Sequence, residues 1–134
     1  MKRSTFAIAS LAWFCILLLA VLNGALREKL LVPALGPVLG LVASGLILCI
    51  CVAAVALLAT PRFGTLSSRD YWMVGLFWLV LTLAFEFSFG YFAQHQSLQA
   101  MLESYAFRGG NLWPFVLLTT FVSPRVSAKV LRLA

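Results

Sequence analysis

The sequence predicts an all-α polytopic membrane protein with four transmembrane helices and a short amphipathic interfacial helix between the third and fourth. Composition is the first indication: 63% of the 134 residues are hydrophobic and only 10% are charged, whereas soluble domains are roughly half apolar and about one quarter charged. The second is that the apolar residues form four blocks, three of which reach the roughly 20 residues that a spanning helix needs. Lipid cannot satisfy backbone polar groups and the blocks do not alternate as barrel strands do, so each should be a helix.

We expect a single domain over residues 1–134, with spans at about 5–26, 37–59, 71–92 and 111–129. The first two spans contain no charged residue, and the third contains only Glu86. The fourth apolar run is interrupted by Pro124 and Arg125. We predict that this helix continues past Pro124 with a kink or a tilt.

Lys2 and Arg3 precede the first block, as basic residues also precede the apolar core of a secretory signal peptide. The apolar run is long for a signal peptide, and no clear small-residue cleavage site follows it. We therefore interpret this block as the first transmembrane helix.

The segment between the third and fourth spans has a different pattern. Leu98, Met101, Leu102 and Tyr105 recur at helical spacing among polar residues. A helix over about 96–106 is too short and too polar to span, so we expect it to lie along the outer membrane surface.

The distribution of basic residues predicts the orientation. With four spans, both termini and the 60–70 loop share one side, and that side holds most of the 10 Lys and Arg residues. Because the side richer in Lys and Arg stays inside, both termini should be cytoplasmic. The net charge of +6 then reflects this asymmetry and contact with anionic lipids. Membrane lipids are the expected partners, and no motif indicates nucleic-acid binding.

Small residues recur every four positions in the second span, at Gly36, Gly40 and Ser44. Such a stripe lets another helix approach closely, either within the chain or in a homo-oligomer. The three cysteines, Cys15, Cys49 and Cys51, lie inside apolar spans. We expect them to be small packing residues and not metal ligands or a disulfide.

Glu86 is the one acidic residue inside a predicted span, and a carboxylate in hydrocarbon must face the protein interior. It lies about 22 Å along its helix from Tyr71, in the outer third of a core of about 30 Å. Arg27, which follows the first span, is the leading candidate for its ion-pair partner, and Arg108 is the second.

The cluster around Glu86 has two interpretations: a set of ion pairs and hydrogen bonds that fixes helix packing, or a polar pocket open to the outer face. No catalytic, metal-binding or cofactor motif occurs, so no cofactor and no catalytic residue is predicted. His95 alone is a poor metal site and more often a solvated interfacial residue. The pocket residues would be Asn23, Arg27, Glu28, Glu86, Ser88, His95, Arg108, Asn111 and Trp113.

Three short groups of residues follow one another along the chain: Asn23, Gly24, Arg27 and Glu28, then 85–90 (FEFSFG), then Arg108, Asn111 and Trp113. This order resembles a family of small bacterial four-span integral membrane proteins whose function is unassigned. The resemblance implies the four-span architecture and a bacterial inner-membrane location, but no mechanism.

The residues favour a small transporter or channel-like protein, working as a homo-oligomer, with Glu86 as the ion- or proton-responsive group. An accessory or structural membrane subunit, in which the cluster only locks packing, is the alternative. A membrane enzyme acting on a lipid-like substrate ranks last, because no nucleophile or metal motif supports it.

Overall fold

The computed structural model describes residues 3–64, 66–89 and 112–132, together with Phe92, Ser97 and Gln99. Within these ranges the protein is all-helical, which confirms the predicted class. The elements in order are α1 (Arg3–Leu26), η1 (Arg27–Leu31), α2 (Val32–Leu35), α3 (Pro37–Ala59), η2 (Thr60–Phe63), α4 (Ser68–Ser88) and α6 (Trp113–Val130).

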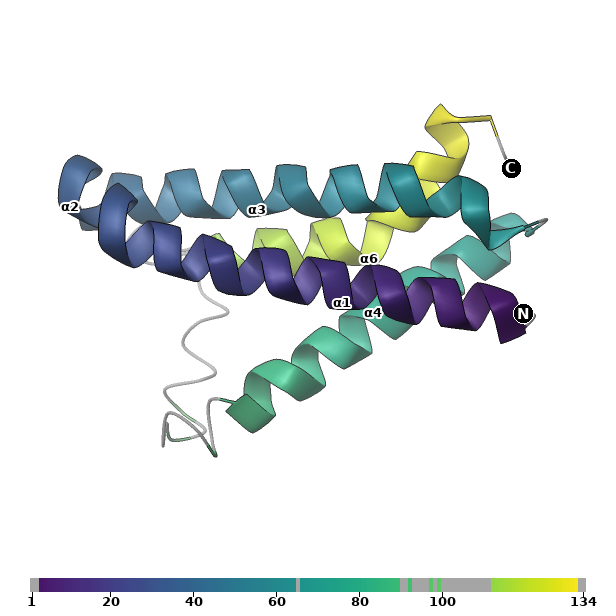
Figure 1. Cartoon of the computed structure of the whole chain (residues 1–134), viewed down its shortest axis with the longest axis horizontal. Helices are drawn as coiled ribbons and strands as arrows, with labels where there is room; N and C mark the ends of the chain where they lie inside the picture. Colours follow the sequence, from purple (N-terminus) through teal and green to yellow (C-terminus); the bar gives the residue numbers. More distant parts are fainter. Residues whose placement is uncertain are drawn as a thin grey trace.

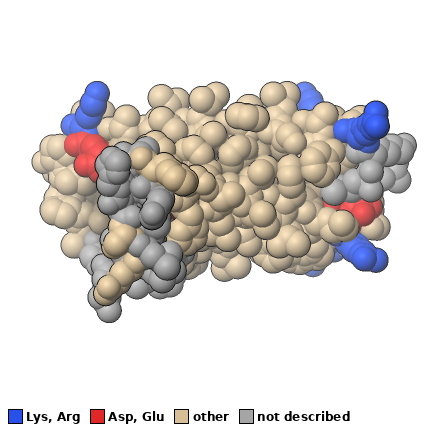
Figure 2. Space-filling view, turned by 90° about the horizontal axis from the view of Figure 1, so that it is seen from below, with Lys and Arg blue, Asp and Glu red and all other residues tan. Residues whose placement is uncertain are grey.

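Three helical segments are long and apolar enough to cross a membrane: Arg3–Leu35, Pro37–Phe63 and Ser68–Ser88. They expose large apolar side chains, among them Leu18, Ile50 and Leu58, each more than 60% accessible. Figure 2 shows an uncharged middle with Lys and Arg at the two ends of the visible face. Such a surface suits contact with lipid, which indicates a membrane protein.

Helix α6 is not among those three segments. It continues through Pro124, as predicted, and its last turns point away from its first ones (Figure 1). A proline inside a helix removes one backbone hydrogen bond and bends the axis. Since Arg125 and Lys129 follow the proline, this helix is the least apolar of the long ones. A fourth span therefore stays a prediction.

Two turns have clear local causes. Gly36 takes a positive φ of 90° between α2 and α3, which glycine tolerates, and Pro37 occupies the first position of α3. At the start of α4, the Ser67 hydroxyl accepts a hydrogen bond from the Asp70 N–H, and the Asp70 carboxylate accepts one from the Ser67 N–H. This capping box fixes where α4 begins.

Helix α6 packs against both α3 and α4, and α1 packs against α3. The beginning of α1 and the end of α6 lie at one end of the bundle, and α2 lies at the other (Figure 1). We call these the terminal end and the α2 end. The bundle is most tightly closed in the terminal half, where Phe63, Tyr71 and Trp78 are almost fully buried.

Helices α4 and α6 approach most closely at Gly75. A methyl group on Gly75 would lie 1.9 Å from the Phe121 carbonyl oxygen of α6. Only glycine permits this backbone contact, which holds the two helices together in the terminal half. The predicted interfacial helix over 96–106, by contrast, lies outside the described residues apart from Ser97 and Gln99.

Candidate functional site

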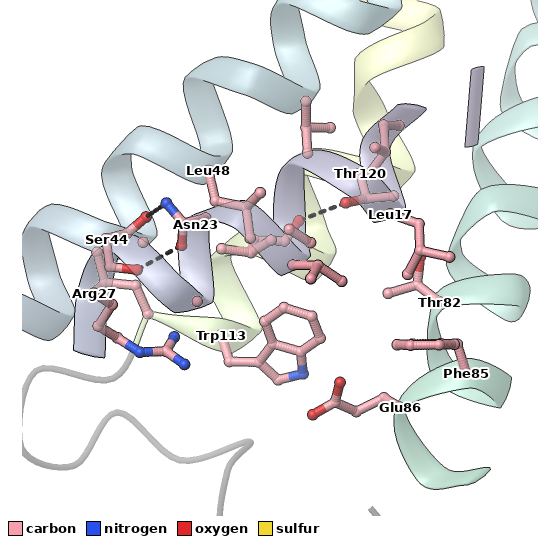
Figure 3. A pocket seen from close by; sticks show the side chains of 18 of the residues that line it. Leu17, Asn23, Arg27, Ser44, Leu48, Thr82, Phe85, Glu86, Trp113 and Thr120 are labelled. Carbon is pink, nitrogen blue, oxygen red and sulfur yellow. Dashed lines mark hydrogen bonds between the residues drawn. The ribbon is translucent and has the colours of Figure 1, made fainter. Parts of the chain in front are cut away.

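A cavity of about 460 Å³ occupies the α2 half of the bundle, enclosed by α1, η1, α3, α4 and α6. Figure 3 shows Arg27, Glu86 and Trp113 directed into it from three different elements. Its polar lining residues are Trp13, Asn23, Arg27, Ser44, Thr82, Glu86, Trp113 and Thr120.

The cavity exists because α1 and α4 separate toward the α2 end (Figure 1). In the terminal half, two tryptophans join these helices. The Trp78 indole N–H donates to the Ala9 carbonyl at 2.9 Å, and the Trp13 indole N–H donates to the Thr82 hydroxyl at 3.0 Å. Trp13 and Thr82 line the cavity, so their hydrogen bond forms its floor.

One wall is fixed by a reciprocal pair between α1 and α3. The Ser44 hydroxyl donates to the Asn23 side-chain oxygen at 2.5 Å, and the Asn23 amide donates to the Ser44 carbonyl at 3.1 Å (Figure 3). Both residues are buried. Asn23 therefore uses both ends of its amide inside the chain, and its first role is to hold the wall.

The predicted direct ion pair between Arg27 and Glu86 is wrong. Arg27 Nε lies 3.3 Å from Glu28 Oε1, in the sole ion pair within 4.0 Å among the described residues. The two residues are the first two of the π-helical turn Arg27–Leu31, and their neighbouring side chains meet there. Arg27 still faces the cavity, but Glu86 lies on the opposite wall (Figure 3).

Glu86 projects from the last turn of α4 and is half-buried. Its carboxylate makes no hydrogen bond or ion pair with any residue of the described ranges. The nearby cavity wall is aromatic: Phe85 stacks on Phe89 with 5.6 Å between ring centroids, and Trp13 and Phe85 pack edge to face with 6.5 Å between centroids. This carboxylate thus faces a partly apolar space without a partner in the described chain.

The structure brings together only part of the predicted site. Asn23, Arg27, Glu86 and Trp113 line the cavity, whereas Glu28 and Ser88 are exposed and do not. The predictions for His95, Arg108 and Asn111 lie outside the described residues.

The sequence reasoning missed the cavity roles of Trp13, Phe85, Phe89 and Thr120. Thr82 carried a signal, because it lies one helical turn before Glu86 on the same face. Trp13 carried none, since its partner Thr82 is 69 positions away.

The small-residue stripe of the second span is used inside the chain. A methyl group on Gly40 would lie 2.8 Å from the Val32 backbone, and Ser44 bonds Asn23. Gly36 has no such neighbour and forms the turn instead. A homo-oligomer through this helix stays a prediction.

No family model, curated protein or solved structure matches this chain.

Proposed function

We propose that this protein is a small membrane transporter whose binding vestibule is the cavity centred on Glu86. The observation that carries the proposal is a carboxylate that makes no hydrogen bond or ion pair with a described residue, held inside a cavity of a membrane helix bundle. A charge at this depth is costly, so an unpaired one is expected to bind a mobile proton or cation. We further propose four spans, both termini in the cytoplasm, and the bacterial inner membrane as the location.

The shape of the cavity supports a gated vestibule over an open channel. The hydrogen bond between Trp13 and Thr82 forms its floor, and buried aromatic residues fill the terminal half below it. An ion bound at Glu86 would therefore need a movement of α4 relative to α1 before it could continue. Alternating access by movement of helix bundles around a fixed site is the usual transporter solution.

Few other charges act on Glu86 within the described residues. Arg27 faces it from η1, and Glu28 offsets part of that charge. The cavity residues of α3 and α6 are not titratable. A change in the protonation of Glu86 would therefore alter the charge balance of the cavity directly.

The test is proton flux into liposomes that contain the purified protein and an internal pH-sensitive dye. Under an imposed pH gradient, we expect the wild-type protein to dissipate the gradient faster than protein-free liposomes. Glu86→Gln should return the rate to the protein-free value, because glutamine carries no exchangeable charge. Glu86→Asp should keep part of the flux.

Asp70→Asn is the matched control, because it neutralises a carboxylate at the opposite end of the same helix, outside the cavity. Its amide oxygen can still accept the Ser67 N–H, so we expect flux to be retained. Flux that is equal in the wild type and in Glu86→Gln, or no flux above protein-free liposomes, would refute a transport role for Glu86.

An accessory membrane subunit is the second candidate. The observation in its favour is that most polar side chains of the bundle bond within the chain, as Asn23, Ser44, Thr82 and Thr120 do. This candidate requires Glu86 to serve packing, so Glu86→Gln would lower stability. The transporter proposal expects the opposite.

A further inference from the structure

The polar side chains that line the cavity differ in whether they already have hydrogen-bond partners within the chain. The Asn23 amide and the Ser44 hydroxyl bond each other. The Thr82 hydroxyl accepts from Trp13 and donates to the Trp78 carbonyl. Thr120 donates to the Val116 carbonyl. Glu86, in contrast, has no such bond to a described residue. On the α4 side of the cavity, the polar group available to a ligand is therefore an anion.

Arg27 makes no direct contact with that anion. Its Nε is paired with Glu28 at 3.3 Å, and no contact within 4.0 Å joins it to Glu86. An exposed ion pair of this kind adds little stability, but it places the negative charge of Glu28 beside the positive charge of Arg27. Arg27, Glu28 and Glu86 together carry a net negative charge, and Glu86 is the carboxylate among them that lines the cavity.

Aromatic rings line the same cavity as this charge. Phe85 and Phe89 stack within 14° of parallel beside it, and the Trp113 ring lies between Glu86 and Arg27 (Figure 3). Ring faces attract organic cations, most strongly when an anion is also near and water is scarce. The same rings offer an apolar surface to the rest of a ligand.

We propose that the cavity binds a monovalent organic cation with an apolar body, its positive charge at Glu86 and its body among Phe85, Phe89 and Trp113. This ligand class rests on the proposed function, since it names what the vestibule would carry. The cavity of about 460 Å³ lies within the range of about 300–1,000 Å³ that is usual for drug-sized ligands.

Other ligand classes fit less well. A hydrated metal ion would need several oxygen or nitrogen ligands, and no group of three His, Cys, Asp or Glu side chains occurs in the part of the chain that was described. Glu86 would repel an anionic ligand, and among the described lining residues only Arg27 would attract it. An uncharged apolar molecule would leave the carboxylate unpaired.

The test uses two probes of the same shape and opposite charge, tetraphenylphosphonium and tetraphenylborate. Equilibrium dialysis against the protein in lipid nanodiscs, with empty nanodiscs subtracted, gives the binding of each. We expect saturable binding of tetraphenylphosphonium that Glu86→Gln weakens at least about tenfold and that Glu86→Asp retains. Tetraphenylborate should not bind more weakly to Glu86→Gln than to the wild type.

Arg27→Gln is the complementary variant. For a cationic ligand it should leave tetraphenylphosphonium binding unchanged or tighter, because a nearby positive charge is removed. Weaker binding in Arg27→Gln, equal binding in Glu86→Gln, or equal affinity for the two probes would overturn the ligand class. A thermal unfolding curve for each variant confirms that the binding measurement was made on folded protein.

The two proposals can fail separately. Glu86-dependent proton flux without saturable tetraphenylphosphonium binding would overturn the organic cation and keep the transporter. Saturable, Glu86-dependent binding without any flux would support the ligand class and overturn transport.

Discussion

Asn23 and Glu86 are both polar residues in apolar helices, yet their surroundings are opposite. Asn23 is 6% exposed and exchanges two hydrogen bonds with Ser44. Glu86 is half-buried and bonds no described residue. A polar side chain in a membrane bundle stabilises the fold only when it is bonded inside the protein. The first residue therefore belongs to the architecture, and the second is available for binding.

We predict that Asn23→Ala lowers the free energy of unfolding in detergent by about 1–2 kcal/mol, because it removes two interhelical hydrogen bonds. Ser44→Ala should have a smaller effect, since it removes one of them. In a double-mutant cycle, the two substitutions should show a clear coupling energy. Additive effects would contradict a direct contact between the two side chains.

Glu86→Gln should leave the thermal unfolding midpoint unchanged or raise it. The substitution keeps the shape of the side chain and removes a half-buried charge, and no bond to a described residue is lost. Differential scanning fluorimetry of the purified variant measures this. A marked fall in the midpoint would favour the accessory-subunit candidate, in which Glu86 serves packing.

At the scale of the helices, the boundaries that the sequence predicted are those with a local physical cause, whereas α4 (Ser68–Ser88) begins and ends before the predicted 71–92. Helix α3 covers the predicted residues, Pro37–Ala59, because Pro37 starts it and Pro61 follows its end. Helix α6 continues through Pro124 as expected. The junction after α1 was less predictable, since the π-helical turn Arg27–Leu31 packs against α3, a contact that the local sequence does not show.

Two glycines allow a comparison at this scale. Gly75→Ala should destabilise the protein by about 1–3 kcal/mol, because its methyl group would meet the α6 backbone. Gly24→Ala meets only the flexible end of Arg27, at 3.7 Å, and alanine is the better helix former. We expect this control to be neutral or slightly stabilising. Unfolding in detergent compares the two, and equal effects would contradict the close α4–α6 crossing.

The whole molecule is closed at one end and hollow at the other. Hydrogen bonds between residues 69 positions apart join α1 and α4 in the terminal half, and the cavity begins where those bonds stop. Sequence patterns show which residues are apolar, but they do not show where two helices separate. For this reason Glu86 and the phenylalanines beside it could be selected from the sequence. The place of Trp13 in the cavity and the missing contact with Arg27 could not.

The topology of the whole chain depends on α6, whose 18 residues give a length of about 27 Å, close to a hydrocarbon core of about 30 Å. We predict that it spans, because it packs along both α3 and α4 and ends at the same end of the bundle as the start of α1 (Figure 1). Green fluorescent protein fused at either terminus should then fluoresce in bacteria, since it folds in the cytoplasm. Alkaline phosphatase fused after Phe89 should be active, because that point lies on the other side. An active phosphatase at the C-terminus would instead establish three spans, and the cavity would then be walled by a helix that does not cross the membrane.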